Sequence, residues 1–226
     1  GAQAVAAMTL GTESVQRVDK ILGPGNRFVQ TAKLLATSYG VAIDMVAGPS
    51  EVLVIADQDA APRTIAADLI SQAEHGADSQ VVLVTDSEPL IKAVTAQLEE
   101  QLSSLPRREL ARASMQQSFA VLVASMDEAV EFSNRYAPEH LILGMDEARK
   151  WVGKVRCAGS VFVGEWSPEV AGDYASGTNH TLPTSRLARN SSGVSLDSFV
   201  NKVTFQELTR EGLKDLAPAL ETLADV

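Results

Sequence analysis

The feature that most constrains this chain is the regular alternation of short apolar runs with longer stretches of helical periodicity through its middle. The apolar runs that we expect to form strands are Val52–Ala56, Gln80–Thr85, Phe119–Ala124, His140–Leu143 and Ser160–Val163. The expected helices are Pro62–His75, Glu88–Leu102, Arg107–Met115, Met126–Tyr136 and Asp146–Val152. Strands that alternate with helices form βαβ units. The pattern therefore predicts an α/β fold of mainly parallel sheets flanked by helices.

The two ends of the chain follow other patterns. Before the middle we expect helices at Ala2–Leu10 and Arg27–Tyr39, strands at Val18–Leu22 and Val41–Met45, and turns at Gly23–Asn26 and Ala47–Ser50. The Gly-Pro-Gly-Asn turn resembles the first turn of a nucleotide-binding βα unit, and polar loop with helices follows from Ser191 onward. We predict three parts: residues 1–50 as the end of a dinucleotide-binding-like α/β domain, residues 51–189 as the main catalytic portion, and residues 190–226 as a small helical appendage.

Composition narrows the classes of partner. The net charge of −10 argues against a nucleic-acid partner, because binding to the phosphate backbone depends on basic groups. The single cysteine, Cys157, excludes an internal disulfide and favours the reducing cytoplasm. No apolar run approaches the roughly 20 residues that span a bilayer, so we expect no membrane segment. The chain opens without Met inside an expected helix and closes inside another, as a recombinant domain or a piece of a longer enzyme would.

The first candidate for chemistry is the pair Glu139 and His140, which follows Pro138 and precedes a short apolar strand. Proline disfavours helix at the residue before it, so the preceding helix should end at Ala137. Neighbouring side chains on an extended segment point to opposite faces, so the two residues can do different work in one site. Histidine suits a general base near neutral pH, and a partly buried Glu can activate water. The alternative is a surface Glu beside a structural His.

The second candidate is Gln72-x-x-His75, near the end of an expected helix. Ile65, Leu69 and Gln72 share one helical face, and an amide within an apolar stripe needs a partner. His75 lies three residues further on, so the two polar groups can converge beyond the helix end, where Gly76 would cap the helix. Both residues could ligate a divalent metal such as zinc. Alternatively, Gln72 bonds to a neighbouring backbone and His75 interacts with the helix carbonyls.

Further candidates lie in turns and in one long loop. The Gly-, Ser- and Thr-rich segment of residues 171–184 carries Asp173 and His180, and long loops after α/β strands are often functional. Asp173 could be an oxygen ligand or a counter-charge for an ammonium group, or the segment could be solvated loop. Ser50 follows a tight turn, and the helix that begins after Asn26 could receive a phosphate at its N-terminus. All three histidines of the chain fall in these candidate segments.

Five segments together resemble the histidinol dehydrogenase family, in that family's order and along the whole chain. They are Val-Asp-Lys-Ile-Leu-Gly-Pro-Gly-Asn, Ala-Gly-Pro-Ser-Glu-Val-Leu-Val-Ile-Ala-Asp, Asp-Leu-Ile-Ser-Gln-Ala-Glu-His-Gly, Arg-Tyr-Ala-Pro-Glu-His-Leu and Gly-Asp-Tyr-Ala-Ser-Gly-Thr-Asn-His-Thr-Leu-Pro-Thr. The resemblance implies α/β domains with incomplete dinucleotide-type folds. It also implies a zinc-containing homodimer that oxidises L-histidinol to L-histidine through the aldehyde in two NAD-dependent steps, the end of histidine biosynthesis.

The resemblance also implies a role for each matching position. Gln72, His75 and Asp173 match the zinc ligands, and these side chains together with Ser50, His140 and His180 match substrate contacts. His140 matches the base that takes the hydroxyl proton, and Glu139 matches the residue that activates water for attack on the aldehyde. Gln3 and Asn26 match NAD contacts.

Two departures from the family bear on this chain. The family's enzymes are about twice as long, and their C-terminal tail supplies a glutamate and a further histidine ligand that have no counterpart before Val226. We therefore expect an incomplete, central-to-C-terminal fragment that is inactive in isolation. The alternative to an enzyme is a non-catalytic binding or assembly module that retains the scaffold.

Overall fold

A computed structural model describes residues 1–46 and 48–225, so Ala47 of the expected turn and the last residue, Val226, lie outside the described residues. The chain divides into two compact units, Gly1–Ser195 and the remainder from Leu196 onward. Each unit is described by itself below.

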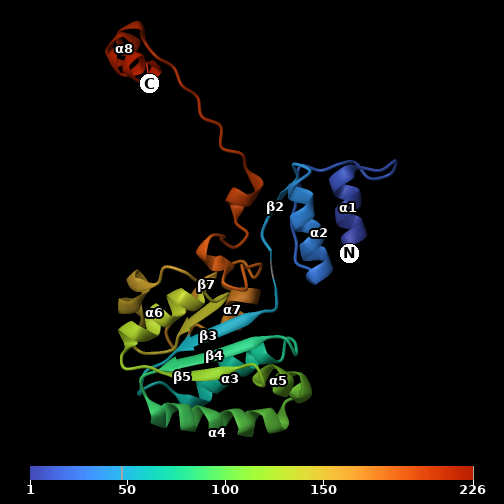
Figure 1. The fold of residues 1–226 in the computed structure, drawn as a ribbon. Helices are drawn as coiled ribbons and strands as arrows, with labels where there is room; N and C mark the ends of the chain where they lie inside the picture. The colour runs from blue at the N-terminus through green and yellow to red at the C-terminus, as the bar shows by residue number, and fades with distance from the viewer. Residues whose placement is uncertain (47, 226) are drawn as a thin grey trace. The chain divides into compact units, whose positions relative to one another are not determined.

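A five-stranded, wholly parallel sheet organises the first unit (Figure 1). Its strands are β3 (Glu51–Ile55), β4 (Gln80–Thr85), β5 (Phe119–Leu122), β6 (His140–Leu143) and β7 (Ser160–Val163). The order across the sheet is β5-β4-β3-β6-β7, so β3 lies at the centre and pairs with β4 on one side and β6 on the other. The prediction of an α/β fold with mainly parallel sheets is confirmed.

Helices cover both faces of this sheet and close two apolar cores (Figure 1). One face is covered by α3 (Pro62–Ala73), α4 (Glu88–Ser104) and α5 (Arg108–Met115), and the other by α6 (Met126–Tyr136) and the 3₁₀ helix η1 (Ala148–Lys154). Residues of β3 alternate between the cores: Val52 and Val54 face α3, whereas Leu53 and Ile55 face α6. Strands buried on both faces explain why the strand segments read as continuous apolar runs.

Local sequence signals set the helix ends. Pro62 occupies the first turn of α3, where its missing N–H leaves no hydrogen bond unmade. The side chains of Ser87 and Ser125 cap α4 and α6 by accepting from Leu90 N and Glu128 N. Helix α6 ends at Ala137, which has a left-handed backbone (φ 56°), as the proline after it led us to expect.

The N-terminal part of the same unit contains α1 (Ala2–Leu10), β1 (Lys20–Ile21), α2 (Arg27–Thr37) and β2 (Ala42–Ile43). The two short strands pair in parallel. A buried ion pair between Lys33 and Asp44 joins α2 to the residue that follows β2. Lys33 Nζ also donates to Gly23 O at 2.9 Å, and Asp44 accepts from Gly23 N at 2.7 Å. The ion pair therefore binds both backbone groups of Gly23, the first residue of the Gly-Pro-Gly-Asn turn.

Three local expectations were wrong. The expected helix Asp146–Val152 is a 3₁₀ helix displaced to Ala148–Lys154. The segment that we expected to be loop from residue 171 begins inside a short helix, α7 (Glu169–Tyr174), so Asp173 is helical. Gly76 does not take the left-handed conformation of a helix cap, because α3 ends at Ala73 and Glu74 is its C-cap, with its N–H bonded back to Ile70 O.

A 3₁₀ turn, η2 (Leu187–Arg189), lies near the end of the first unit.

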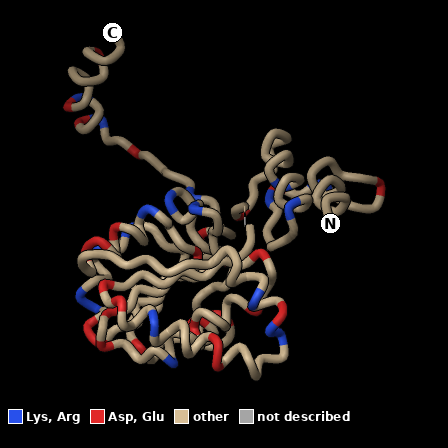
Figure 2. The backbone as a smooth tube through the Cα atoms, turned by 60° about the horizontal axis from the view of Figure 1, so that its bottom comes forward, with Lys and Arg blue, Asp and Glu red and all other residues tan. Residues whose placement is uncertain are grey.

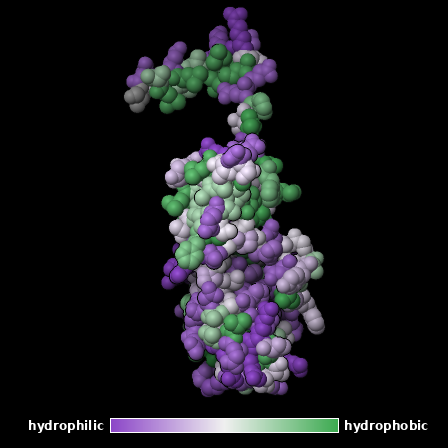
Figure 3. All heavy atoms as spheres, turned by 90° about the vertical axis from the view of Figure 1, so that its right-hand side faces the viewer, coloured by the Kyte–Doolittle hydropathy of each residue, from purple (hydrophilic) through white to green (hydrophobic). Residues whose placement is uncertain are grey.

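The second unit has little interior of its own. It contains a 3₁₀ turn, η3 (Leu196–Phe199), an extended stretch and α8 (Arg210–Ala224), and neither helical element has a buried residue. Apolar side chains lie on its surface (Figure 3), among them Phe205, Leu213, Leu220 and Leu223.

The charge distribution of the first unit follows its secondary structure (Figure 2). Figure 2 shows acidic and basic residues interspersed along the helices and loops of the first unit, while its strands are largely uncharged. Among the described residues, no helix is both long and apolar enough to cross a membrane.

Candidate active site

The candidate residues gather at the amino edge of the five-stranded sheet. Glu51 begins β3 and His140 begins β6, and Val52 lies beside His140 in the strand register. Helix α3 returns from the end of β3 to the start of β4, so its last turn, with Gln72, reaches this same edge. Ligands in open α/β sheets usually bind at the carboxyl edge. This site lies at the opposite edge.

Glu139 is buried, with 5% of its surface exposed, and its carboxylate accepts from Glu51 N at 3.0 Å. Burial and, to a lesser extent, the charges of Glu51 and Asp173 raise the pKa of Glu139 to about 8, against hydrogen bonds from Glu51 N and the Ser50 side chain. A carboxyl group with a pKa near neutrality can both accept and return a proton at physiological pH.

His140 is equally buried, and its two ring nitrogens have different surroundings. Nδ1 lies 3.2 Å from Glu51 O, a carbonyl that can only accept, so Nδ1 carries the proton and donates. Nε2 is buried without a hydrogen-bond partner, which leaves its lone pair free. Burial lowers the pKa of His140, and the bond to Glu51 and the charge of Asp173 act against that effect. His140 is therefore held as a neutral base that presents Nε2.

Sequence reasoning missed three acidic groups around the pair. Glu169 is 2% exposed, with Oε1 3.8 Å from His140 Nδ1 and Oε2 without a hydrogen-bond partner, and burial raises its pKa to about 8. Burial also raises the pKa of Asp68, on α3 one turn before Gln72, to about 6. The backbone N–H of Glu51 binds the Glu139 carboxylate, and its backbone carbonyl binds His140. The one signal in the sequence that could have identified any of these groups was at Glu51, an acidic residue directly before an apolar run.

The expected zinc ligands have a donor chemistry that fits the metal. Gln72 is 1% exposed, and neither its amide oxygen nor its amide nitrogen has a hydrogen-bond partner. His75 directs Nδ1 at Ser71 O, 2.8 Å away, which leaves Nε2 as the free ligand atom. Asp173 interacts electrostatically with His140, and so does His75. Among the described residues no three His, Cys, Asp or Glu side chains form a metal-binding group. Of the three predicted zinc ligands only His75 and Asp173 are residues of these types, because the third, Gln72, is an amide.

The remaining predicted residues are distributed unevenly. Ser50, His75 and Asn26 all line one cavity of about 950 Å³ between the amino edge and the start of α2. Asn26 Oδ1 caps α2 by accepting from Phe28 N and Val29 N, so it occupies two donors that a phosphate would have used. Gln3, on α1, does not line this cavity. His180 is exposed, in the stretch after α7.

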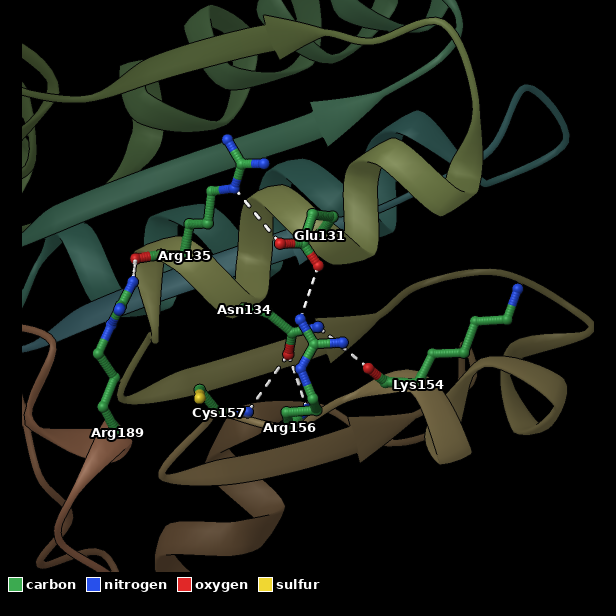
Figure 4. Close-up of polar contacts among 7 residues, drawn as sticks. All are labelled: Glu131, Asn134, Arg135, Lys154, Arg156, Cys157 and Arg189. Atoms are coloured by element: carbon green, nitrogen blue, oxygen red, sulfur yellow. Dashed lines mark hydrogen bonds and ion pairs between the residues drawn. The ribbon is translucent and has the colours of Figure 1, made fainter.

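The last turn of α6, before Glu139 and His140, is bonded to two other parts of the chain (Figure 4). Asn134 Nδ2 donates to Lys154 O at 3.0 Å, while its Oδ1 accepts from Arg156 N at 2.7 Å and Cys157 N at 3.3 Å. Arg189 donates to Arg135 O, in the last turn of α6. These bonds hold the last turn of α6, which leads into Glu139 and His140, against residues 154–157 and Arg189.

A wholly parallel sheet, a buried carboxyl group and a neutral imidazole with one free nitrogen define the class: an α/β protein with an acid–base centre. The chain matches the family described as histidinol dehydrogenase across residues 1–226. The chain therefore belongs to the histidinol dehydrogenase family.

Individual relatives agree with this placement. The chain is 55% identical to the protein named histidinol dehydrogenase, chloroplastic, of Arabidopsis thaliana, over 100% of this chain and 49% of that protein. The crystal structure of histidinol dehydrogenase from Elizabethkingia anophelis superposes with a TM-score of 0.95 at 54% identity, over 99% of this chain and 52% of that one. An acetylating aldehyde dehydrogenase from Geobacillus thermoglucosidasius shares the fold, with a TM-score of 0.57 at 16% identity, over 91% of this chain and 60% of that one. The chain spans about half the length of its histidinol dehydrogenase relatives.

Proposed function

We propose that this chain supplies the catalytic pair of an enzyme that oxidises L-histidinol to L-histidine through the aldehyde, with NAD as oxidant. One observation carries the proposal: a buried carboxyl group bonds to the N–H of Glu51, a buried neutral imidazole bonds to the carbonyl of the same residue, and the imidazole keeps Nε2 free. The family and the relatives named histidinol dehydrogenase supply the substrate class.

His140 acts in the oxidation of the alcohol. Its Nε2 takes the hydroxyl proton of the substrate as the hydride leaves the carbon, and the positive charge that results on the ring lies near the carboxyl groups of Glu139 and Glu169. General bases in such positions typically contribute about 10²–10⁴-fold to the rate.

Glu139 acts on the aldehyde. Its carboxylate takes a proton from water, and the oxygen of that water attacks the aldehyde carbon to give the hydrate that the second oxidation consumes. The hydrogen bonds from Glu51 N and Ser50 direct the carboxylate, and Ser50 and His180 are the further substrate contacts that we propose.

We propose Gln72, His75 and Asp173 as zinc ligands, because the unpartnered amide oxygen of Gln72 and the Nε2 of His75 are available to an ion. When bound, zinc would anchor the imidazole and amino groups of the substrate. The site residues of the chain then orient the alcohol toward His140.

We propose Asn26 and Gln3 as contacts of NAD, which accepts the hydride when bound. Asn26 lines the same cavity as Ser50 and His75, so a cofactor there would reach the substrate. We further propose a homodimer in the cytoplasm, without nucleic acid as a partner. The net charge of −10 argues against nucleic acid, the exposed apolar residues of the second unit favour an interface between two copies, and the single cysteine favours the cytoplasm. Light scattering and cell fractionation test the dimer and the location.

The deciding experiment separates the two half-reactions. This chain, supplied with the other half of the enzyme, is assayed for NADH formation from L-histidinol and, separately, from L-histidinal. We expect His140→Asn to slow the reaction of histidinol by about 10²–10⁴-fold, and Glu139→Gln mainly to slow that of histidinal. Wild-type rates for both variants on both substrates would contradict the assignment and favour a non-catalytic assembly module.

A further inference from the structure

Strained backbone concentrates around the catalytic pair. Among the described residues, three that are not glycine have a positive φ: Ala137 at 56°, Ser185 at 55° and Arg186 at 68°. Such conformations cost on the order of 1–3 kcal/mol each and persist only where the surroundings fix them, commonly at functional sites. Ala137 lies two residues before Glu139. Ser185 and Arg186 lie far along the chain, so their connection to the pair has to be spatial.

That connection is the segment Thr184–Arg189, which we name the strap. It is bonded at three points to segments that carry or adjoin the site. Thr184 Oγ1 accepts from Gly48 N, Ser185 N donates to the carboxylate of Glu51, and Arg189 donates to Arg135 O. Two of these bonds fix the segment of residues 48–51, and the third fixes the end of α6.

Glu51 is where the strap meets the catalytic pair. Its peptide N–H holds Glu139 at 3.0 Å and its carbonyl holds His140 Nδ1 at 3.2 Å, so a rotation of this residue displaces both side chains. Glu51 is 7% exposed, and its carboxylate accepts from Ser185 N and lies beside the side chain of Tyr136. The hydroxyl of Tyr136 donates its hydrogen to Gln80 Oε1 at 2.6 Å.

We propose that Glu51 is a positioning residue of this enzyme: its carboxylate, held by Ser185 N of the strap, fixes the Glu51 backbone, whose N–H and carbonyl set Glu139 and His140. The inference rests on the catalytic roles proposed for those two residues. Burying a carboxyl group at the start of an apolar strand is costly without such a function, and Val52–Ile55 need no polar anchor for their own packing. Misplacement of a catalytic group by about 1 Å can cost roughly 100-fold in rate.

The tautomer of His140 reports this positioning without any turnover. The chain has only three histidines, so ¹⁵N-histidine labelling gives three imidazole patterns, and His140→Asn assigns one of them. We expect the Nδ1–H tautomer for wild type, a mixture with the Nε2–H tautomer for Glu51→Ala, and the wild-type pattern for Glu51→Gln, whose amide oxygen can still accept from Ser185 N. His75, held by Ser71, is the internal control and should not change.

Two further variants protect the test. Ser185→Gly keeps the N–H donor and suits the positive φ, so it should leave the tautomer unchanged. If circular dichroism shows that Glu51→Ala is unfolded, Tyr136→Phe removes the polar group beside the Glu51 carboxylate and should give a smaller change of the same kind. A folded Glu51→Ala, or in its place Tyr136→Phe, with an unaltered His140 pattern overturns the proposal.

Kinetics of the complete enzyme then separate this inference from the function beneath it. Glu51→Ala should lower kcat on both histidinol and histidinal by about 10–100-fold, while KM changes by less than about 3-fold and Glu51→Gln restores most of the rate. If His140→Asn and Glu139→Gln lose activity while a folded Glu51→Ala keeps it, the positioning role is wrong and the proposed function stands. If none of the three variants loses activity, the proposed function itself is wrong.

Discussion

At the scale of single residues, the site holds carboxyl groups in surroundings that favour their protonated form. Burial raises the pKa values of Glu139 and Glu169 to about 8 each, and the two groups interact with each other and with Asp173. A carboxyl group whose pKa is higher in the folded state retains its proton after the unfolded chain has released one. Its contribution to stability is complete below the unfolded value of 4.5 and is lost as the pH rises toward 8.

This sign gives a prediction for Glu169→Gln in the metal-free chain. The amide of Gln has the shape of a protonated carboxyl group but does not ionise, so this position no longer makes stability depend on pH. The free energy of unfolding of the variant should therefore rise relative to that of wild type by on the order of a few kcal/mol between pH 5 and pH 9. Denaturant titrations at several pH values measure this difference. Glu165→Gln, at an exposed position, serves as the matched control. If the difference in free energy of unfolding between Glu169→Gln and wild type stays constant with pH, the raised pKa of Glu169 is contradicted.

At the scale of elements, the structure depends on a few side chains that bind backbone groups of neighbouring elements. Asn134 is the clearest case, because one buried amide satisfies Lys154 O, Arg156 N and Cys157 N (Figure 4). We expect Asn134→Ala to lower the free energy of unfolding by about 2–3 kcal/mol, since it leaves those groups without partners. Thermal or denaturant melting checks this.

The control for Asn134 is its neighbour. Arg156 pairs with Glu131 at 2.7 Å, but both side chains are well exposed, and exposed ion pairs add little. Arg156→Met should therefore melt like wild type. An Arg156→Met as destabilised as Asn134→Ala would show that the ion pair, and not the amide, holds this connection.

A second element-scale prediction concerns the buried pair Lys33 and Asp44 in the N-terminal layer. Lys33→Met leaves Asp44 buried without its cation and should cost about 3–5 kcal/mol. The double variant Lys33→Met with Asp44→Leu removes both charges and should recover part of that loss. Denaturant unfolding of the single and double variants forms the test, and an additive double variant would contradict it.

Much of this element structure could be predicted from sequence, because local rules set it. The apolar run of β4, the proline at Pro62 and the break before Pro138 each act within a few residues, and the corresponding elements lie where they were expected. The prediction was wrong where tertiary contacts decide, as in α7: glycine within it suggested loop, but Gly172 packs against the ring of Phe162 and the turn becomes helical. Glu51 and Glu169 escaped notice because their partners lie far away in sequence.

At the scale of the whole molecule, the two units differ in how much interior they have. The first holds all the buried strands and both cores of the sheet, whereas η3 and α8 of the second have no buried residue. A chain ending at residue 195 should therefore melt within a few degrees of the 226-residue chain. Differential scanning calorimetry on both forms compares them. A large fall in melting temperature would show that the first unit depends on the second.

The placement of β3 at the centre of the sheet has a consequence for how the chain reaches its folded form. The bond from His140 to the Glu51 carbonyl joins residues 89 positions apart, and β4, α4, α5, β5 and α6 all lie between them. Pairing of β3 with β4 can form early, but the Glu51 backbone can bind Glu139 and His140 only after β6 has closed against the other side of β3. Contacts so distant in sequence form slowly. A folding intermediate that contains only β3, β4 and β5 therefore lacks the arrangement on which the proposed chemistry depends.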